Sequence, residues 1–387
     1  MKKGLTEPPS NVLNQHVQER RLHEWGEIGR RVAEARRAVG LTQEDLAEAL
    51  GLDRTAVSKV ESGKREIDSL ELARLSRVLA RPIDWFLYED APALVSYRRE
   101  LGPSSAAASG ERLLDSLVRD VELLLELGLL TATEHSEPFV PENISEAVDA
   151  AASARRIVGQ PQGPISSLAD VAERLGVFAF CHELPPGAFE GAYVSLPQGG
   201  VALVDGSLEF VRRRFTLAHE LGHHFMGADY ALDWRPGRDE AGHEALVNVF
   251  AINLLIPRDD LASRWRDLRG SADVREFLLR TSFEYRVSWS ALCAHARNLE
   301  LIDESMHRAL SSQLPKRAEL MERGLYVLED VPTPLLSPAF VSGVLKGYRQ
   351  FKLARERALE ILRGTLAVDD LPQLPQLPLE ALRSEFD

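Results

Sequence analysis

The sequence predicts an α+β protein that is mostly helical, with several domains and one small sheet near the middle of the chain. Apolar residues recur at helical spacing along most of the 387 residues. Short apolar runs bounded by Pro and Gly are grouped between residues 177 and 205, as expected for strands. A chain of this length has room for two or three domains and a sizeable core.

Composition narrows the class of protein further. An apolar fraction of 44% with 27% charged residues is ordinary for a soluble globular protein. The sequence has no apolar run of membrane-spanning length and a polar N-terminus, so we expect a cytoplasmic protein without membrane contact. Cys181 and Cys293 fit a reducing compartment. The net charge of −13 excludes a protein coated in nucleic acid, but it allows a small DNA-reading module.

The N-terminal part is predicted to be a polar segment, residues 1–26, followed by short helices in residues 27–90. Thr42 is a good N-cap for a helix that ends at Gly51, and a second helix runs over Arg54–Glu61. Two short helices joined through a glycine turn predict a helix-turn-helix arrangement.

In that arrangement the second helix enters the major groove of DNA. Its outward residues can contact bases, while neighbouring residues contact the phosphate backbone. The candidates for DNA contact are Gln43, Arg54, Thr55, Ser58, Lys59 and Lys64, with Arg65 beside them. The alternative is a small helical bundle used for protein contact, in which these cations are only solvated.

The spacing of residues in this part closely resembles the XRE (Cro/phage-repressor) DNA-binding family. The residues that carry the resemblance are Gly40-Leu41-Thr42-Gln43, Leu46-Ala47, Leu50-Gly51-Leu52, Val57-Ser58, Glu61 and Gly63-Lys64-Arg65, continuing through Leu70, Leu75, Leu79 and Trp85-Phe86-Leu87. The resemblance implies a five-helix domain that binds a double-stranded DNA operator. We expect a homodimer if that operator is palindromic.

Residues 91–140 are predicted to be a linker with an amphipathic helix. Pro92, Pro103 and the Ser/Ala/Gly-rich run Ser104–Gly110 indicate an irregular, exposed connection. The amphipathic helix over Glu111–Leu130 is expected to pack within the chain rather than on a second copy.

Residues 141–314 are predicted to be one domain with a short sheet, followed by a helical tail in residues 315–387. The candidate strands are Val177–Glu183, Gly191–Leu196 and Val201–Asp205. They directly precede a helix over Ser207–Met226, for which Ser207 is the expected N-cap. The tail is expected to hold a possible strand pair and a helix over Ser337–Arg363.

The helix Ser207–Met226 contains one HExxH motif, formed by His219, Glu220 and His223. The two histidines are four residues apart and project from the same helix face. Two imidazoles so placed can hold one zinc ion at about 2.0–2.1 Å, with the Glu220 carboxylate beside it. Alternatively, the two histidines are simply packed and hydrogen-bonded in the core.

A zinc site of this kind needs a third ligand, for which the downstream helix before Pro257 offers Glu244. Asn248 lies one turn further on, where its amide can accept a bond from the ring N–H of a ligand histidine. The rival third ligands are Asp229, Asp239, Glu240 and His243.

These two helices together resemble the ImmA/IrrE family of metallopeptidases. The matching residues are Phe215-Thr216-Leu217-Ala218-His219-Glu220-Leu221-Gly222-His223, then Glu244, Asn248, Phe250-Ala251 and Leu254-Leu255-Ile256-Pro257, with Val247 as a departure. The resemblance implies a zincin-like fold, with His219, His223 and Glu244 as metal ligands and Glu220 as the base. It also implies that the substrate is a helix-turn-helix repressor.

The predicted function is therefore a DNA-binding transcriptional regulator with a zinc endopeptidase domain. Manganese is also possible, since a His/His/Glu set accepts other divalent ions.

The substrate is expected to be a separate repressor or the protein's own DNA-binding domain, cut through Ser104–Gly110. Peptidases of this architecture hold an extended substrate on a sheet edge; which strand forms that edge stays open. The oxyanion donor also stays open among Tyr193, Tyr230 and His243. The alternatives are a transcription factor whose metal site is structural or sensing, and an antitoxin-like protein that binds a partner.

Overall fold

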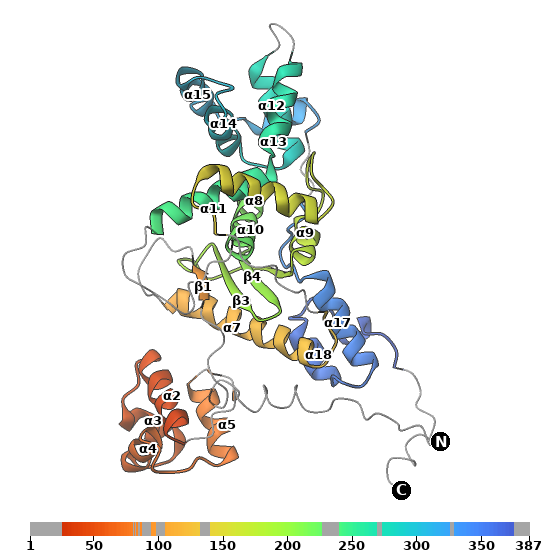
Figure 1. Cartoon of the computed structure of the whole chain (residues 1–387). Coiled ribbons are helices and arrows are strands. Elements are labelled where there is room, and N and C mark those ends of the chain that lie inside the picture. Colours follow the sequence, from red (N-terminus) through yellow and green to blue (C-terminus); the bar gives the residue numbers. More distant parts are fainter. Residues whose placement is uncertain are drawn as a thin grey trace, which may run out of the picture. The chain divides into compact units, whose positions relative to one another are not determined.

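The computed structural model describes residues 25–79, 94–97, 105–131, 140–226, 240–268, 273–325 and 329–374, with the single residues 81, 83 and 86. The chain forms two compact units, residues 1–91 and 92–387. Helices predominate, and the strands of the described residues form a single small sheet (Figure 1). The prediction of a mostly helical α+β protein is therefore confirmed. The finer domain boundaries stay a prediction.

The first unit is a bundle of short helices. They are α2 (Trp25–Ala38), α3 (Gln43–Leu50), α4 (Arg54–Glu61) and α5 (Ser69–Val78). Thr42 forms a capping box with Asp45 at the start of α3, and Gly51 ends that helix with a φ of 70°. Asp53 caps α4. These local signals place both helices where the sequence predicts them. The fifth helix implied by the resemblance, near Trp85-Phe86-Leu87, falls largely outside the described residues.

The second unit is built on a sheet with the strand order β1-β3-β4-β2. Its strands are β1 (Leu94–Tyr97), β2 (Val177–His182), β3 (Gly191–Leu196) and β4 (Gly199–Asp205). The β3–β4 hairpin is antiparallel, β2 runs parallel to β4, and β1 runs antiparallel to β3. The three predicted strands are present, and the predicted linker contributes the fourth strand.

The segment predicted as an irregular linker is helical in the structure. Helix α7 (Ser105–Glu126) begins inside Ser104–Gly110, so the prediction of an exposed connection there is wrong. Alanine has the highest helix propensity, and the small side chains of this run allow close packing. Ala107 is buried, and a Cβ at Gly110 would lie only 2.8 Å from the Phe189 ring.

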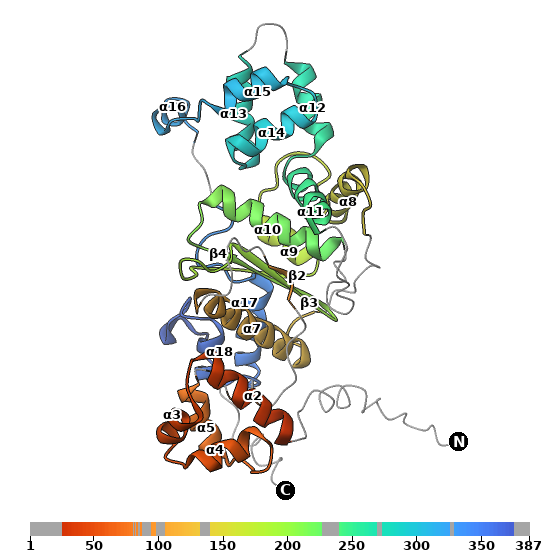
Figure 2. The ribbon, with the colours of Figure 1, turned by 90° about the vertical axis from the view of Figure 1, so that its left-hand side faces the viewer.

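The sheet lies between two layers of helices (Figures 1 and 2). One side carries α8 (Ile144–Ile157), α9 (Leu168–Arg174), α10 (Phe210–Phe225) and α11 (Glu240–Leu255). The other side carries α7, α17 (Pro338–Arg349) and α18 (Arg355–Ile361). The main core joins β2, β3 and β4 to α8, α10 and α11.

The central helix α10 starts later than the sequence predicts. It begins at Phe210 with Glu209 at the N-cap position, so Ser207 is not its cap. The Ser207 side chain instead donates a 2.7 Å hydrogen bond to Asp205 at the end of β4. Ser207 therefore belongs to the turn between the strand and the helix.

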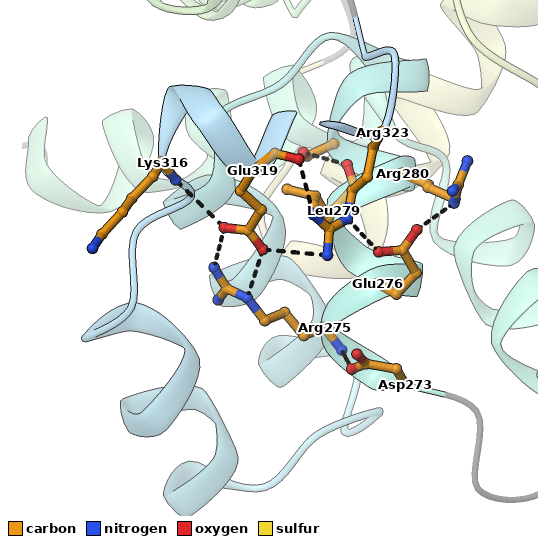
Figure 3. A network of polar contacts seen from close by, with 9 residues as sticks. Asp273, Arg275, Glu276, Leu279, Arg280, Lys316, Glu319 and Arg323 are labelled. Atoms are coloured by element: carbon orange, nitrogen blue, oxygen red, sulfur yellow. Dashed lines mark hydrogen bonds and ion pairs between the residues drawn. The ribbon is translucent and has the colours of Figure 1, made fainter. Parts of the chain in front are cut away.

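The chain after α11 continues into a helical part. Its elements are α12 (Arg258–Asp267), α13 (Val274–Tyr285), α14 (Trp289–Asn298), α15 (Glu304–Ser311) and α16 (Arg317–Glu322). Figure 3 shows how ion pairs attach α16 and the turn after it to α13, with Arg275 paired to Glu319 and Arg323 to Glu276. These partly exposed pairs each contribute at most about 1 kcal/mol. Since α16 has no fully buried residue, it is held more weakly than the core helices.

The helical tail differs from the prediction in two ways. The expected helix Ser337–Arg363 is split into α17 and α18, because Phe351 takes a positive φ of 59° and ends α17 with a left-handed turn. The expected strand pair is reduced, within the described residues, to one bridge between Cys181 and Leu335. The last short element is the 3-10 helix η1 (Val368–Asp370). Over the described residues, no helix has both the length and the apolar character needed to cross a bilayer.

Candidate metal centre and DNA-recognition surface

Helix α10 places the HExxH residues in the interior of the second unit. His219 is 1% exposed, His223 is 2% exposed and Glu220 is fully buried. The helix packs on β3 and β4 with one side and on α11 with another, so that most of its circumference is covered. The burial follows from the apolar residues that surround the motif on nearly every side of the helix.

Helix α11 brings Glu244 to the two histidines. Gly222 lets α11 approach α10 closely, because a Cβ there would lie 3.0 Å from Val247 and 3.1 Å from Phe250. The Glu244 carboxylate oxygens lie 3.3 Å from His219 Nε2 and 3.4 Å from His223 Nε2. The two Nε2 atoms are 3.1 Å apart. Three potential metal-ligand atoms therefore converge on one point.

This triangle of atoms has the right size for a zinc ion. Ligands at about 2.0–2.1 Å from a tetrahedral ion are separated from each other by about 3.3–3.4 Å. The two nitrogens are 3.1 Å apart, and they lie 3.3 Å and 3.4 Å from different oxygens of Glu244, so the spacing is close to that value. Two nitrogens and one carboxylate leave the fourth position of a tetrahedron open, which is the arrangement of catalytic rather than structural zinc. Glu244 is half-exposed, so the open side of the triangle faces solvent more than the histidines do.

Asn248 orients His219. Its Oδ1 lies 3.2 Å from His219 Nδ1, and its Nδ2 donates a 2.9 Å bond to the backbone oxygen of Glu244. Because Nδ2 is used as the donor, Oδ1 faces the ring and accepts the Nδ1 proton. This contact turns the Nε2 edge of the His219 ring toward His223 and Glu244.

Glu220 lies between α10 and the start of β3. A Cβ at Gly191 would lie 2.6 Å from Glu220 Oε1 and 2.4 Å from Thr216 Cγ2, so only glycine leaves room for this carboxylate. Gly191 is a site residue that the sequence alone does not single out, because its only signal there is its place at the beginning of a predicted strand.

The charges around Glu244 favour its ionised form. Burial would raise the pKa of this carboxyl, but the hydrogen bond with His219 and the proximity of His223 and His243 lower it overall. A ligand carboxylate must be ionised to bind a metal, so this environment suits that role.

The three candidates for an oxyanion donor have different positions. Tyr193 is buried, its hydroxyl lies 2.6 Å from His224 Nδ1, and burial raises its pKa. His224 also reaches the backbone oxygen of Leu175 at 2.7 Å, so this pair ties α10 to the sheet and to the end of α9. The His243 ring lies 6.0 Å from the His223 ring. Tyr230 lies outside the described residues.

The rival ligands are not tested by the structure. Asp229 and Asp239 lie outside the described residues, and the side chain of Glu240 is not described. His243 is half-buried beside the site, but the ligand atoms that converge belong to His219, His223 and Glu244.

The first unit presents the residues expected to contact DNA on its surface. Arg54, Thr55, Ser58, Lys59 and Lys64 are exposed. The inward residues of α4, Val57 and Val60, are buried in the core of the unit. The spacing of α4 thus separates a polar outer face from an apolar inner face.

Gln43 is less free than the sequence suggests. Its amide donates a 2.7 Å hydrogen bond to Glu61, which also accepts a 2.6 Å bond from Arg36. This contact fixes the start of α3 against the end of α4 and holds the side chain in one orientation.

Fold and site together define a chain that joins a helix-turn-helix domain to a domain of metallopeptidase type. Comparison with protein families agrees with both parts. Residues 32–86 match the family described as Helix-turn-helix, and residues 172–297 match the IrrE N-terminal-like domain. Both predicted resemblances are confirmed: the chain joins a helix-turn-helix domain to an IrrE N-terminal-like domain.

Individual relatives match a shorter stretch. Uncharacterized HTH-type transcriptional regulators from Sinorhizobium medicae (strain WSM419) and Rhizobium meliloti (strain 1021) are each 34% identical over 65 residues, covering 17% of this chain and 46% of the relative. An uncharacterized transcriptional regulator in the ATPase CF(0) region of Rhodospirillum rubrum is 36% identical over 64 residues, covering 16% of this chain and 59% of that protein. The chain thus spans about half the length of these relatives.

One solved structure is also similar. The restriction-modification controller protein from Aeromonas hydrophila is 35% identical, with 16% of this chain and 94% of that chain covered and a TM-score of 0.16.

Proposed function

We propose that the second unit is a metal-dependent endopeptidase and that the first unit binds double-stranded DNA. The observation that supports the peptidase most is the cluster of His219, His223 and Glu244, whose nearest ligand atoms are 3.1–3.4 Å apart, with Glu220 on the same helix as the two histidines. The proposed metal is zinc, and manganese suits the same ligands.

In the proposed reaction, His219, His223 and Glu244 hold the metal and Asn248 fixes the ring orientation of His219. A bound divalent metal supplies Lewis-acid activation of water and of the scissile carbonyl. Glu220 accepts the proton of the attacking water at a carboxylate oxygen and later delivers it to the leaving amine. We assign the oxyanion donor to His243 rather than Tyr193, because the Tyr193 hydroxyl is engaged with His224.

The DNA-binding proposal rests on the exposed face of α4. Arg54 and Lys59 are cations on a helix whose opposite side is buried, as is required of a helix that enters the major groove. We propose that the chain binds a palindromic operator as a homodimer. Selection of bound sequences from random duplex DNA with the full chain identifies that operator.

The proposed substrate of the peptidase is a helix-turn-helix repressor, either a separate protein or this chain. Residues Ser105–Gly110 are a poor cleavage site, because they belong to α7. An extended peptide is needed at a peptidase site, and a packed helix does not present one.

The test of the peptidase compares Glu220→Gln with Glu209→Gln. Both changes remove one carboxylate from α10 or its cap, but Glu209 is exposed and makes no cap hydrogen bond. Each zinc-loaded or manganese-loaded chain is incubated with itself and with helix-turn-helix repressors, and fragments are identified by mass spectrometry. We expect cutting by the wild type and by Glu209→Gln, with the rate reduced by about 10²–10⁴-fold in Glu220→Gln.

The opposite result is equally informative. If no metal-loaded chain cuts any of these proteins while wild type and Glu220→Gln shift the same DNA equally, the peptidase proposal is wrong. The chain would then be a transcription factor whose metal site senses or stabilises.

A further inference from the structure

The outer strand on the β3 side of the sheet comes from the segment that follows the DNA-binding unit. The first unit ends at Ala91, and β1 begins at Leu94. Its backbone runs antiparallel to β3, with Leu94 opposite Val194, Ser96 opposite Tyr193 and Tyr97 opposite Ala192. In the strand order β1-β3-β4-β2, it covers the edge that β3 would otherwise expose.

This edge is the one that adjoins Glu220. Tyr97 pairs with Ala192, and the next residue of β3 is Gly191, the position at which a Cβ would lie 2.6 Å from Glu220 Oε1. Helix α10 also contacts β1 directly. The C-terminal end of β1 therefore points along β3 toward the proposed catalytic carboxylate.

The opposite edge of the sheet has a different environment. It is formed by β2, which is separated from β3 by β4, and Cys181 on β2 exchanges two backbone hydrogen bonds with Leu335. A peptide paired there would have both β2 and β4 between itself and Gly191 on β3. Among the described strands, β3 is the one whose outer side, now paired with β1, adjoins Glu220.

An extended peptide binds a sheet edge by adding a strand, with main-chain hydrogen bonds providing much of the affinity. Residues Leu94–Tyr97 make this kind of contact with β3 in cis. We infer that β1 occupies the peptide-binding edge of the site and must leave β3 before a separate substrate can pair there. The inference rests on the proposed peptidase function and names the chain's own segment as the first occupant of that site.

The inference is tested by binding, without catalysis, in the full chain carrying Glu220→Gln. The probe is a fluorescent peptide with the sequence of residues 92–101. Val95→Pro/Ser96→Pro removes two consecutive N–H groups from β1, whereas the matched control Val95→Ala/Ser96→Ala keeps them. We expect the peptide to bind the proline variant at least about ten-fold more tightly, because the competing strand is released. Equal affinity in both variants would overturn the inference.

A second measurement covers the case in which the proline variant does not fold. Tyr97→Cys/Ala192→Cys places one thiol on each strand at a paired position, while the native Cys181 and Cys293 are buried. The oxidised chain should lose binding of the peptide, and a reductant should restore it. Binding that is the same before and after reduction would contradict occupancy of this edge by β1.

Failure of the peptidase proposal has a separate signature. Here the proline variant keeps an intact Glu220. If it binds the peptide more tightly than the alanine control but does not cut it in the presence of zinc or manganese, the β3 edge is the binding site and the peptidase proposal is wrong. If both variants cut the peptide and bind it with equal affinity, the peptidase proposal stands and the inference about β1 is wrong.

Discussion

Helix α4, the proposed recognition helix, and helix α10, which carries the HExxH motif, hold their proposed functional side chains in opposite environments. On α4 the residues proposed to act are exposed, and the residues that fold the unit are Val57 and Val60 on the other side. On α10 the residues proposed to act are at most 2% exposed. On α4, the residues proposed to bind DNA are therefore different from the residues that stabilise the fold. On α10, the proposed metal site and the stability of the fold depend on the same buried contacts.

This difference has a physical origin. A helix that reads DNA must present donors to an aqueous groove, so its cations stay hydrated in the free protein. A metal centre needs fixed ligand positions, which packing and hydrogen bonds from neighbouring residues supply. Substitutions near α10 should therefore change stability or metal affinity, and substitutions on the outer face of α4 should change only DNA binding.

The largest expected effect is on a buried ion pair of α10. Arg214 is fully buried and pairs with Asp330, which also accepts a 2.8 Å bond from the backbone N–H of Leu168. Asp330→Asn leaves a buried cation without its counter-ion and should cost about 3–5 kcal/mol in the free energy of unfolding. The control Glu190→Gln breaks the more exposed pair with Arg212 and should cost at most about 1 kcal/mol. Urea unfolding followed by circular dichroism distinguishes them; equal costs would refute the contrast.

The pH dependence of stability is the next effect. His295 is 4% exposed, and burial lowers its pKa to about 4. Between this value and the unfolded pKa of about 6.5, the unfolded chain binds more protons at this position, so lowering the pH destabilises the fold. The accumulated loss by pH 4 should be roughly 3 kcal/mol. Urea unfolding at several pH values should show a shallower dependence in His295→Asn; identical slopes would contradict this origin.

A smaller effect is expected at Asn248. Asn248→Ala removes the partner of His219 Nδ1 and should lower metal affinity by about 10–100-fold. Asn253→Ala is the matched control, because Asn253 lies on the same helix and also bonds to a backbone carbonyl, that of Val249. Isothermal titration with zinc checks both variants. A similar loss of affinity in the two variants would show that Asn248 acts through the helix and not through His219.

The smallest effect is expected from a substitution on the outer face of α4. Arg54→Ala should weaken binding to the selected operator by about 1–3 kcal/mol and leave thermal unfolding unchanged within about 0.5 kcal/mol. Arg77→Ala removes the same charge from the exposed surface of α5 and should leave specific binding nearly unaffected. Fluorescence anisotropy at fixed salt measures this. If Arg54→Ala lowered the stability of the fold instead, the exposed residues of α4 would contribute to folding as well as to DNA binding.

The first unit could be predicted closely because its signals are local. Thr42, Asp53 and Gly51 fix the ends of α3 and α4 through contacts within a few residues. The HExxH spacing likewise places two imidazoles on one face of α10. Each of these inferences needs only the geometry of one helix.

The remaining features depend on contacts between distant residues. Strand β1 has only four residues, too few to show a strand pattern of their own, and it is defined by its pairing with β3. The role of Gly191 follows from the position of Glu220, and the burial of Arg214 follows from Asp330. The helical start of α7 is not evident from the sequence, because Ser and Gly in its first turns favour a loop while its alanines favour a helix.

The proposed metal centre of His219, His223 and Glu244 can be tested directly. Zinc X-ray absorption spectroscopy on the full chain, loaded with one equivalent of metal, measures the ligands directly. We expect two imidazole nitrogens at about 2.0–2.1 Å and a carboxylate oxygen at about 2.0–2.2 Å, with the histidine signal lost in His219→Ala/His223→Ala. A spectrum without histidine ligands, or one that the double substitution leaves unchanged, would contradict it.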